Sequence, residues 1–267
     1  MTSPASSTAA HAHSAPSAGP VQLEIAVQDV EGALTAVRNG ADRLELCVAL
    51  ASIGGLTPSI GLVKHVLAAL QAEAAATGRP EVGVCVLVRP AEGGFVYGEE
   101  AVAITVSDVA ALASLGGVQG VVVGALNADG SVDRDAMGRI VAAAGGMDVV
   151  FHRAIDVASA PEALLEDVIG QGCVRVLTSG GAAASGDGVD ALARMVAVSN
   201  GRIQIMAGGG VSIEAIPALL QAGVDSIHLS AKGVRASDPT GPGGGIPEVL
   251  FTDGAVVAAA RAAIDAA

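Results

Sequence analysis

The sequence predicts an α/β protein that folds as a single (β/α)8 barrel, a TIM barrel, over residues 21–267. Short runs of Val, Ile and Leu alternate with longer helical segments, and this alternation indicates a parallel sheet. Eight such pairs fit the chain of 267 residues, which is a usual size for one closed barrel. An open doubly wound sheet is the alternative. It would require a glycine-rich loop after the first strand, and the residues there are Val27-Gln28-Asp29-Val30.

Each expected strand is a short aliphatic or β-branched run that suits a strand buried on both faces. In the fifth strand, Val149 and Phe151 have this character, and polar residues follow at once. The eight strands in chain order are Leu23–Val27, Arg43–Cys47, Val82–Val88, Gln119–Val123, the start of Val149–Asp156, Val174–Thr178, Ile203–Ala207 and Asp225–Leu229.

The expected helices lie between these strands, and several carry a start or stop signal. Gly40 ends the first helix, Pro58 and Pro161 lie near helix starts, and Ser212 is an N-cap. A Gly- and Pro-rich loop is expected over about 238–247. The helices are Glu31–Asn39, a segment from about Pro58 to Thr77, Val102–Leu115, Arg134–Ala144, Pro161–Ile169, Asp190–Val198, Ser212–Gln221 and Asp253–Ala266.

Composition excludes several classes of function. The net charge of −13 and an aromatic content of 1% argue against a nucleic-acid partner, which needs cations and stacking rings. No apolar run reaches the length of a membrane span. Three cysteines are too few for a disulfide framework and fit a reducing compartment. Residues 1–20 are rich in Ala, Ser, Pro and Thr and predict a disordered tail.

An internal repeat indicates which strand positions face the barrel axis. A glycine ends the helix before each even-numbered strand, and aliphatic residues follow it at fixed offsets; these glycines are Gly40, Gly117, Gly172 and Gly223. The aliphatic positions are expected to face the helices, so the alternate positions face the axis. The odd-numbered strands are assigned in the same way. The ionisable residues that this alternation gathers at one barrel mouth are Glu24, Glu45, Arg89, His152 and His228.

More polar groups follow the ends of the strands, where ligands bind in parallel α/β folds. Arg153 and Asp156 come directly after the fifth strand, although a structural ion pair between them is the alternative. Three corners rich in Gly and Ser predict an anion or phosphate site built partly from backbone N–H groups. Tight turns alone would also explain these glycines. The residues concerned are Ser179, Gly180, Gly208, Gly209, Gly210, Ser230 and Lys232.

If the barrel is an enzyme, His152 is the expected general acid or base, because an unperturbed imidazole titrates near neutral pH. Glu24, Glu45 and Asp156 are the carboxylates that would share proton transfer, since two close carboxylates raise one pKa. Arg89 would hold a substrate anion through its planar fork. A resting ion-pair network, with Arg89 as the counter-ion of the two glutamates, is the alternative.

Three sulfur atoms are also assigned to the barrel interior, on Cys47, Cys85 and Met206. Soft sulfur ligands suit Cu(I). Small hydrophobic residues of the core are the alternative interpretation. No spacing in the sequence indicates a zinc site, a Walker loop or a nucleophile elbow, and no organic cofactor is predicted.

Seven blocks of sequence, in order along the chain, resemble the copper homeostasis protein CutC family. They are Leu23-Glu-Ile25, Gly40–Cys47, Gly54–Ser59, Arg89-Pro90, Phe151–Asp156, Val176–Gly180 and Met206–Val211. The resemblance spans about Leu23 to Ile264. It implies a cytoplasmic TIM barrel that handles copper, binds Cu(I) through cysteine and forms a dimer.

Two positions depart from the family pattern. Ala26 stands where the family often has Cys, and Ala91–Phe95 replaces a loop that usually reads Arg-Gly-Gly-Asp-Phe. Cys47 is then the cysteine left at a family position. Two functions stay open: a copper-binding homeostasis protein using Cys47, and an enzyme acting on a small anionic or phosphorylated molecule.

Overall fold

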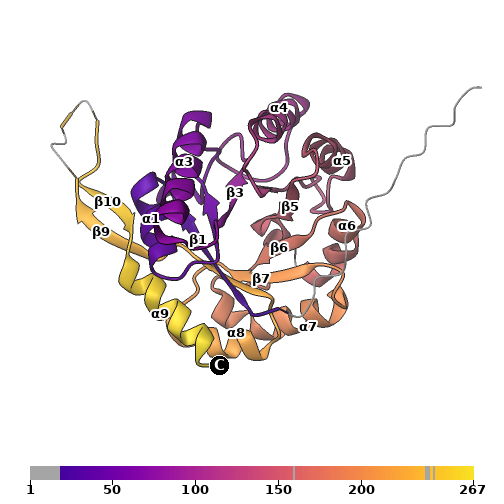
Figure 1. Cartoon of the computed structure of the whole chain (residues 1–267). Helices are drawn as coiled ribbons and strands as arrows, with labels where there is room; N and C mark the ends of the chain where they lie inside the picture. The colour runs from indigo at the N-terminus through magenta and orange to yellow at the C-terminus, as the bar shows by residue number, and fades with distance from the viewer. Residues whose placement is uncertain (1–18, 159, 238–240, 243) are drawn as a thin grey trace, which may run out of the picture.

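The fold is a closed barrel of eight parallel strands, β1 to β8, in sequential order around the ring, as the sequence predicts. A computed structural model of the chain describes residues 19–158, 160–237, 241–242 and 244–267. Figure 1 looks into the ring of strands, with the helices outside it. The strands are β1 Gln22–Val27, β2 Arg43–Leu46, β3 Gly83–Leu87, β4 Gly120–Val123, β5 Asp148–Phe151, β6 Arg175–Thr178, β7 Gln204–Gly208 and β8 Ser226–Leu229.

The helices connect successive strands and cover the outside of the barrel. Asp29, Ser59, Asp133 and Asp253 are N-caps whose side chains accept a backbone N–H of the first turn. The α-helices are α1 Val30–Arg38, α2 Leu50–Ile53, α3 Ile60–Thr77, α4 Glu99–Leu115, α5 Arg134–Ala143, α6 Leu165–Gly170, α7 Val189–Ser199, α8 Ile216–Gln221 and α9 Gly254–Asp265. Short 3-10 turns precede α6, α7 and α8, and another, Arg153–Val157, follows β5.

Two apolar clusters confirm the expected alternation along the strands. Leu44, Val86 and Phe151 belong to the large core between the barrel and its helices. The barrel interior holds a second, smaller cluster, formed by Cys47, Cys85, Leu87, Val122, Val150, Leu177 and Met206. The strand pairing then fixes heights inside the barrel, because Glu24 pairs with His228, and Glu45 pairs with both Ala26 and Cys85.

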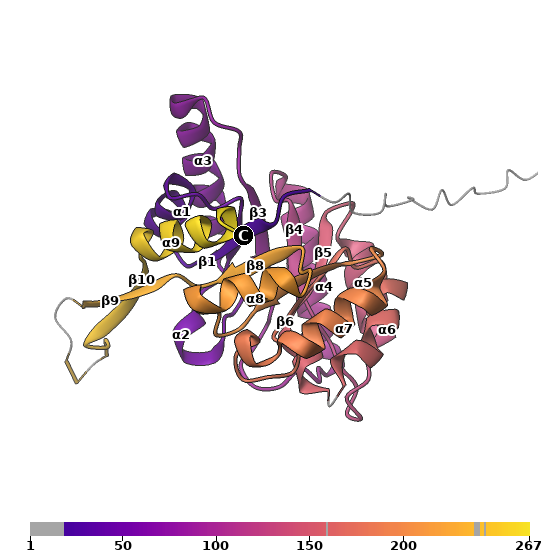
Figure 2. The same cartoon turned by 90° about the horizontal axis from the view of Figure 1, so that it is seen from below.

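The main departure from the sequence prediction follows β8. Two antiparallel strands, β9 Lys232–Ala236 and β10 Glu248–Thr252, form a hairpin that projects from the barrel (Figure 2). The Gly- and Pro-rich loop expected over 238–247 is the tip of this hairpin and lies partly outside the described residues. β10 packs beside α1, and a Cβ at Gly32 would stand 2.6 Å from Thr252 Oγ1. The mixed polar sequence of β9 has no strand periodicity that would have revealed it.

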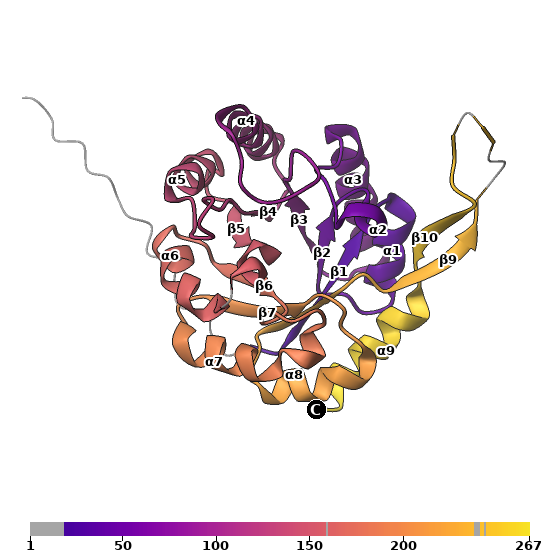
Figure 3. The same cartoon turned by 180° about the vertical axis from the view of Figure 1, so that it is seen from behind.

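The two ends of the chain differ in how far the structure describes them. The tail predicted for residues 1–20 lies outside the described residues, except for Gly19 and Pro20. The final helix, α9, packs beside α1 and α8 and completes the outer ring (Figure 3). In the part of the chain that the structure describes, no helix has the length and apolar character to cross a membrane.

Candidate functional site

A cavity of about 610 Å³ opens at the carboxyl ends of the barrel strands. Most of the residues that the sequence assigns to the mouth lie on its wall: Glu45, Arg89, His152, Arg153, Gly209, Gly210, His228, Ser230 and Lys232. Glu24, Asp156, Ser179, Gly180 and Gly208 are absent from the lining, and the contacts described below give the reason.

Glu24, His228 and Glu45 form a chain of ionisable groups across β1, β8 and β2. Glu24 Oε1 lies 2.8 Å from His228 Nδ1, and His228 Nε2 lies 3.7 Å from Glu45 Oε2. Arg43, below them in β2, donates from Nε to the other oxygen of Glu24 and from Nη1 to Gln22. Glu24 is completely buried, so it supports the cavity from beneath and corrects the expectation that it faces a ligand.

The pKa values of Glu24, His228 and Glu45 are shifted in different directions. Burial alone would raise the pKa of Glu24, but Arg43 and His228 outweigh it and hold that pKa well below its usual range. Burial would lower the pKa of His228, but the carboxylates of Glu45 and Glu24 raise it. Burial raises the pKa of Glu45 to about 7 despite the opposing effect of His228, and the charge of Glu24 adds to this increase. Glu45 can therefore both hold and release a proton near neutral pH.

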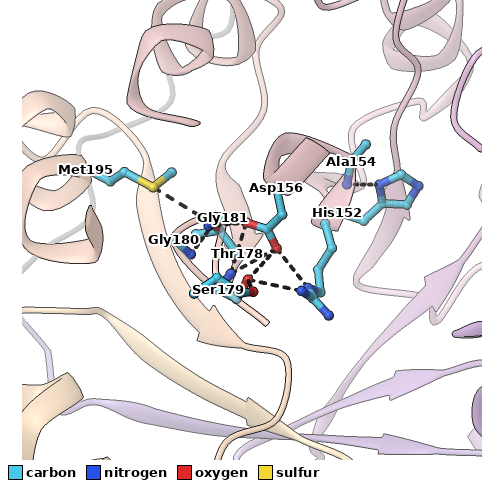
Figure 4. Close-up of polar contacts among 10 residues, drawn as sticks. His152, Ala154, Asp156, Thr178, Ser179, Gly180, Gly181 and Met195 are labelled. Atoms are coloured by element: carbon cyan, nitrogen blue, oxygen red, sulfur yellow. Dashed lines mark hydrogen bonds and ion pairs between the residues drawn. The ribbon is translucent and has the colours of Figure 1, made fainter. Parts of the chain in front are cut away.

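His152 lies across the cavity at the end of β5, with its Nδ1 accepting the backbone N–H of Ala154 at 3.2 Å (Figure 4). Its Nε2 is buried and has no hydrogen-bond partner among the described residues. Burial, with the nearby charge of Arg89, lowers the pKa of His152 to about 4. The imidazole is therefore neutral at physiological pH, and its expected role in proton transfer stays a prediction.

The ring of His152 is held between neighbours. A Cβ at Gly124 would lie 2.3 Å from His152 Cε1, so only glycine leaves room for the imidazole there. On another side, the centroid of the Phe95 ring lies 4.8 Å from that of His152. Phe95 comes from the loop after β3 and also lines the cavity. The ring is therefore fixed in position and shielded from water.

Asp156 is bonded entirely within the protein (Figure 4). Its Oδ1 accepts from Thr178 Oγ1 at 2.5 Å and from the N–H groups of Ser179 and Gly181 at 3.1 Å each. Its Oδ2 accepts from Arg153 Nε at 2.8 Å and from Ser179 Oγ at 3.0 Å. Asp156 thus fastens the loop after β6 to the turn after β5. It is a structural clasp rather than the catalytic carboxylate that the sequence suggested.

The same contacts remove Ser179 and Gly180 from the predicted anion site. The N–H of Ser179 is bound to Asp156, and the N–H of Gly180 donates to Thr178 Oγ1 at 2.9 Å. Arg153 donates to this clasp but also lines the cavity, and a Cβ at Gly209 would lie 2.6 Å from its Cζ. Gly209 therefore has to be a glycine for the guanidinium of Arg153 to reach the cavity wall.

Gly208 and Arg89 also have roles that the sequence did not predict. Gly208 ends β7, where a Cβ would lie 2.4 Å from Leu177 Cδ1, so it is a packing glycine below the cavity. Arg89 donates from Nη1 to the carbonyls of Ile53 and Gly55 and from Nη2 to that of Gly93. Its planar fork therefore braces the loops after β2 and β3, which corrects its expected role as the anion clamp.

Cys47, Cys85 and Met206 do not form a fitting copper site. Cys85 pairs with Glu45, so Cys47 stands two residues higher, about 7 Å along the strand direction. The two thiols therefore do not lie side by side on the two strands. Burial raises the pKa of both thiols, that of Cys85 to about 12, and opposes the thiolate form that binds metal. The sulfur of Met206 accepts from Arg43 Nη2 at 3.5 Å. The described residues also contain no cluster of three His, Cys, Asp or Glu that could hold a metal ion.

The sequence interpretation missed two buried arginines at the opposite end of the barrel. Arg43 is 2% exposed, and Arg175 is 4% exposed and donates from Nε to Gln204 at 2.9 Å. Both occupy inward positions by the same alternation that selected Glu45 and Leu177, so the signal was present in the sequence. Arg43 matters for the site because it fixes the charge of Glu24.

Comparisons with known proteins identify relatives of the chain. A family model described as the CutC family matches residues 21–233. A protein named family protein CutC from Glaesserella parasuis is 40% identical over 218 residues, which cover 81% of this chain and 85% of that protein. A protein of the same name from Agrobacterium fabrum is 42% identical over 221 residues, covering 82% of this chain and 83% of the relative.

A solved structure shares the fold. The CutC protein of Streptococcus agalactiae, provisionally called a copper homeostasis protein, is 28% identical and superposes with a TM-score of 0.69. The match covers 79% of this chain and 98% of that one. The family match ends at residue 233, so most of the β9–β10 hairpin and all of α9 lie beyond it.

Proposed function

The chain belongs to the CutC family, and we propose that its barrel mouth carries out general acid–base chemistry on a small anionic metabolite. The observation that carries this proposal is Glu45, a carboxyl group on the cavity wall with its pKa raised to about 7. General acid–base catalysis works best when the pKa of the catalytic group lies near the working pH. A purely structural carboxylate would instead be ionised and fully paired.

His228 and Glu24 support this role from behind Glu45. Glu24 and His228 each stabilise the charged form of the other, so the pKa of Glu24 is lowered and that of His228 is raised. A protonated His228 beside Glu45 stabilises the carboxylate that forms when Glu45 gives up its proton. The Nε2–Oε2 separation of 3.7 Å leaves room for this contact to tighten when a ligand enters.

Two cations on the cavity wall favour an anionic ligand. Arg153 has a half-exposed side chain and Lys232 is exposed, and both line the cavity. Among the described residues, Arg153 uses Nε and Nη2 for Asp156 and Ser179, which leaves Nη1 for a ligand. The chain as a whole carries a net charge of −13 and repels anions, so attraction has to come from local cations of this kind.

The proposal is tested by following a panel of small phosphorylated and carboxylated metabolites by NMR with the purified protein. We expect turnover of at least one compound, and a decrease of about 100-fold or more with Glu45→Gln. Glu81→Gln is the matched control, because it makes the same chemical change at an exposed position before β3. Equal turnover by Glu45→Gln and the unchanged protein would remove Glu45 from the mechanism.

Copper handling is the second candidate function, favoured by the description of the Streptococcus agalactiae relative. The residue proposed for it is Cys47, whose sulfur lies at the base of the mouth, 3.7 Å from where a Cβ on Gly55 would stand. Its raised thiol pKa and the spacing of the sulfurs lead us to expect weak Cu(I) binding. An anaerobic Cu(I) titration tests this, and equal affinity of Cys47→Ser and the unchanged protein would rule out Cys47 as a copper ligand.

We further propose a cytoplasmic location, supported by three cysteines that are all free and buried. Free thiols in a chain with no disulfide suit a reducing compartment. The homodimer expected from the family resemblance stays a prediction, and light scattering of the full chain would test it.

A further inference from the structure

We propose that His152 is a neutral hydrogen-bond donor to a carbonyl oxygen of the substrate, so that the reaction is proton transfer at a carbon next to that carbonyl. The inference rests on the proposed acid–base function of Glu45 and deepens it by naming the class of substrate. It concerns a side chain whose free nitrogen has no partner in the described part of the protein.

The hydrogen bond from Ala154 fixes the tautomer of His152. A backbone N–H can only donate, so Nδ1 of His152, which receives it at 3.2 Å, carries no proton. A charged imidazolium has a proton on both nitrogens and could not accept this bond. His152 is therefore neutral with its single proton on Nε2, in agreement with the lowered pKa.

The Nε2–H group of His152 can donate to a ligand, because the described residues offer it no acceptor. It is buried, it has no partner in the described residues, and its residue lines the same cavity as Glu45. Buried donors in folded proteins are normally paired, and exceptions often mark ligand or catalytic sites. His152 and the Phe95 ring beside it both line the cavity, where a ligand oxygen can supply the missing acceptor.

A neutral donor suits an oxygen on which negative charge develops during the reaction. A preorganised N–H near a carbonyl oxygen stabilises the enolate formed when an adjacent C–H bond is broken. A neutral imidazole can do this by hydrogen bonding alone, without transferring its proton. By contrast, Arg153 and Lys232 are fixed cations and suit a group that is already anionic, such as a carboxylate or phosphate.

The proposed step moves a proton from a substrate carbon to Glu45 and back. The ionised carboxylate of Glu45 takes a proton from the carbon next to the carbonyl, and the electrons of that C–H bond form the C=C bond of an enolate. The carbonyl electron pair moves to oxygen, where His152 Nε2–H donates to it. Glu45, now a carboxylic acid, returns its proton to carbon and the carbonyl reforms. In D2O, exchange of Glu45 with solvent therefore introduces deuterium at that carbon.

The tautomer is tested directly by ¹⁵N NMR of histidine-labelled protein, with the signals of His152 identified by their loss in His152→Gln. We expect the proton on Nε2 at about pH 7 and no titration until well into the acidic range. A proton on Nδ1, or titration near the ordinary histidine pKa, would overturn the assignment. This measurement needs neither substrate nor activity.

The reaction class is tested by deuterium exchange in D2O, using 2-oxo acids and phosphorylated ketoses and aldoses as probes. We expect exchange with at least one probe. His152→Leu, which has no donor, should lower the rate by about 100-fold or more, whereas His152→Gln, which keeps an N–H donor, should remain within about tenfold of the original rate. Equal losses in the two variants would mean that the imidazole itself transfers the proton, and this would overturn the donor role.

The outcomes separate this inference from the proposed function. If Glu45→Gln abolishes turnover of a metabolite but no deuterium enters at carbon, Glu45 stays in the mechanism and the carbonyl inference fails. If no probe exchanges, the carbonyl inference also fails. If exchange occurs but is unchanged in Glu45→Gln, the proposed function fails instead.

Discussion

Two charged clusters at the same end of the barrel differ in how completely they are bonded. Around Asp156, both carboxylate oxygens accept hydrogen bonds from Thr178, Ser179, Gly181 and Arg153. Around Glu45, the nearest charged group among the described residues is His228, at 3.7 Å. The residue types are similar, but the carboxylate of Asp156 has no capacity left for a ligand. A reactive carboxyl group is therefore identified by the hydrogen-bond partners that it lacks.

The carboxyl groups of Asp156 and Glu45 also differ in their electrostatic surroundings. The clasp at Asp156 joins a carboxylate to the guanidinium of Arg153 in an ion pair, which stabilises the loop after β6. The carboxyl group of Glu45 is buried without a close hydrogen bond, so its pKa rises to about 7. One cluster therefore contributes to folding at neutral pH, and the other reduces stability in order to keep a titratable group in the cavity.

The largest expected effect is the loss of the clasp. Asp156→Asn should lower the free energy of unfolding by about 4 kcal/mol and the melting temperature by about 10 °C, because it removes a buried charge from its partners. The matched change Glu45→Gln should not lower stability at pH 7, since it removes a carboxyl group that is costly to ionise and that has no close hydrogen bond among the described residues. Urea unfolding of both variants makes the comparison, and equal losses would contradict it.

The next effect is the pH dependence that Glu45 gives to stability. Its folded pKa of about 7 lies above the ordinary glutamate pKa of 4.5, so the unfolded chain ionises first as the pH rises. Stability should therefore fall by about 3 kcal/mol between pH 4.5 and pH 7, relative to Glu45→Gln at each pH. A difference between the two proteins that does not vary with pH would show that Glu45 is not held neutral.

His152 should give the opposite slope. Its folded pKa of about 4 lies below the ordinary histidine pKa of 6.5, so the unfolded chain takes up a proton first as the pH falls. Relative to His152→Gln, the unchanged protein should lose about 3 kcal/mol as the pH falls from 6.5 to 4. Measuring both variants in one pH series separates the two slopes, which otherwise cancel over most of that range.

The sequence was sufficient to predict the barrel and the direction in which most strand residues point. A period of two is a local property, and it correctly turned Glu45, Cys85 and Met206 inward. The same rule places Arg43 inside, although the sequence interpretation did not include it among the inward residues. The β9–β10 hairpin was missed because its strands are mixed in polarity and its stability comes from packing beside α1.

The roles of the mouth residues could not be predicted because they depend on loop geometry. Arg89 donates to two carbonyls of the loop after β2 and to that of Gly93 in its own loop, and no pattern in its own segment shows this. Asp156 is saturated by N–H groups more than 20 residues away in sequence. The tautomer of His152 depends on one backbone N–H in the turn after β5. Residue type predicts where chemistry can occur. Only the hydrogen-bond partners of each carboxyl group distinguish the cluster around Asp156 from that around Glu45.

The smallest expected effect concerns Thr178, which belongs to the clasp but does not touch the cavity. Its Oγ1 donates to Asp156 and accepts the N–H of Gly180, and it is completely buried. Thr178→Val keeps the shape but leaves these two groups with one partner fewer, so the free energy of unfolding should fall by about 1–2 kcal/mol. Turnover of any metabolite found in the panel should stay within about twofold, because Glu45 and His152 keep their surroundings. A large loss of turnover without a loss of stability would mean that the clasp takes part in the chemistry, and the division between the two clusters would then be wrong.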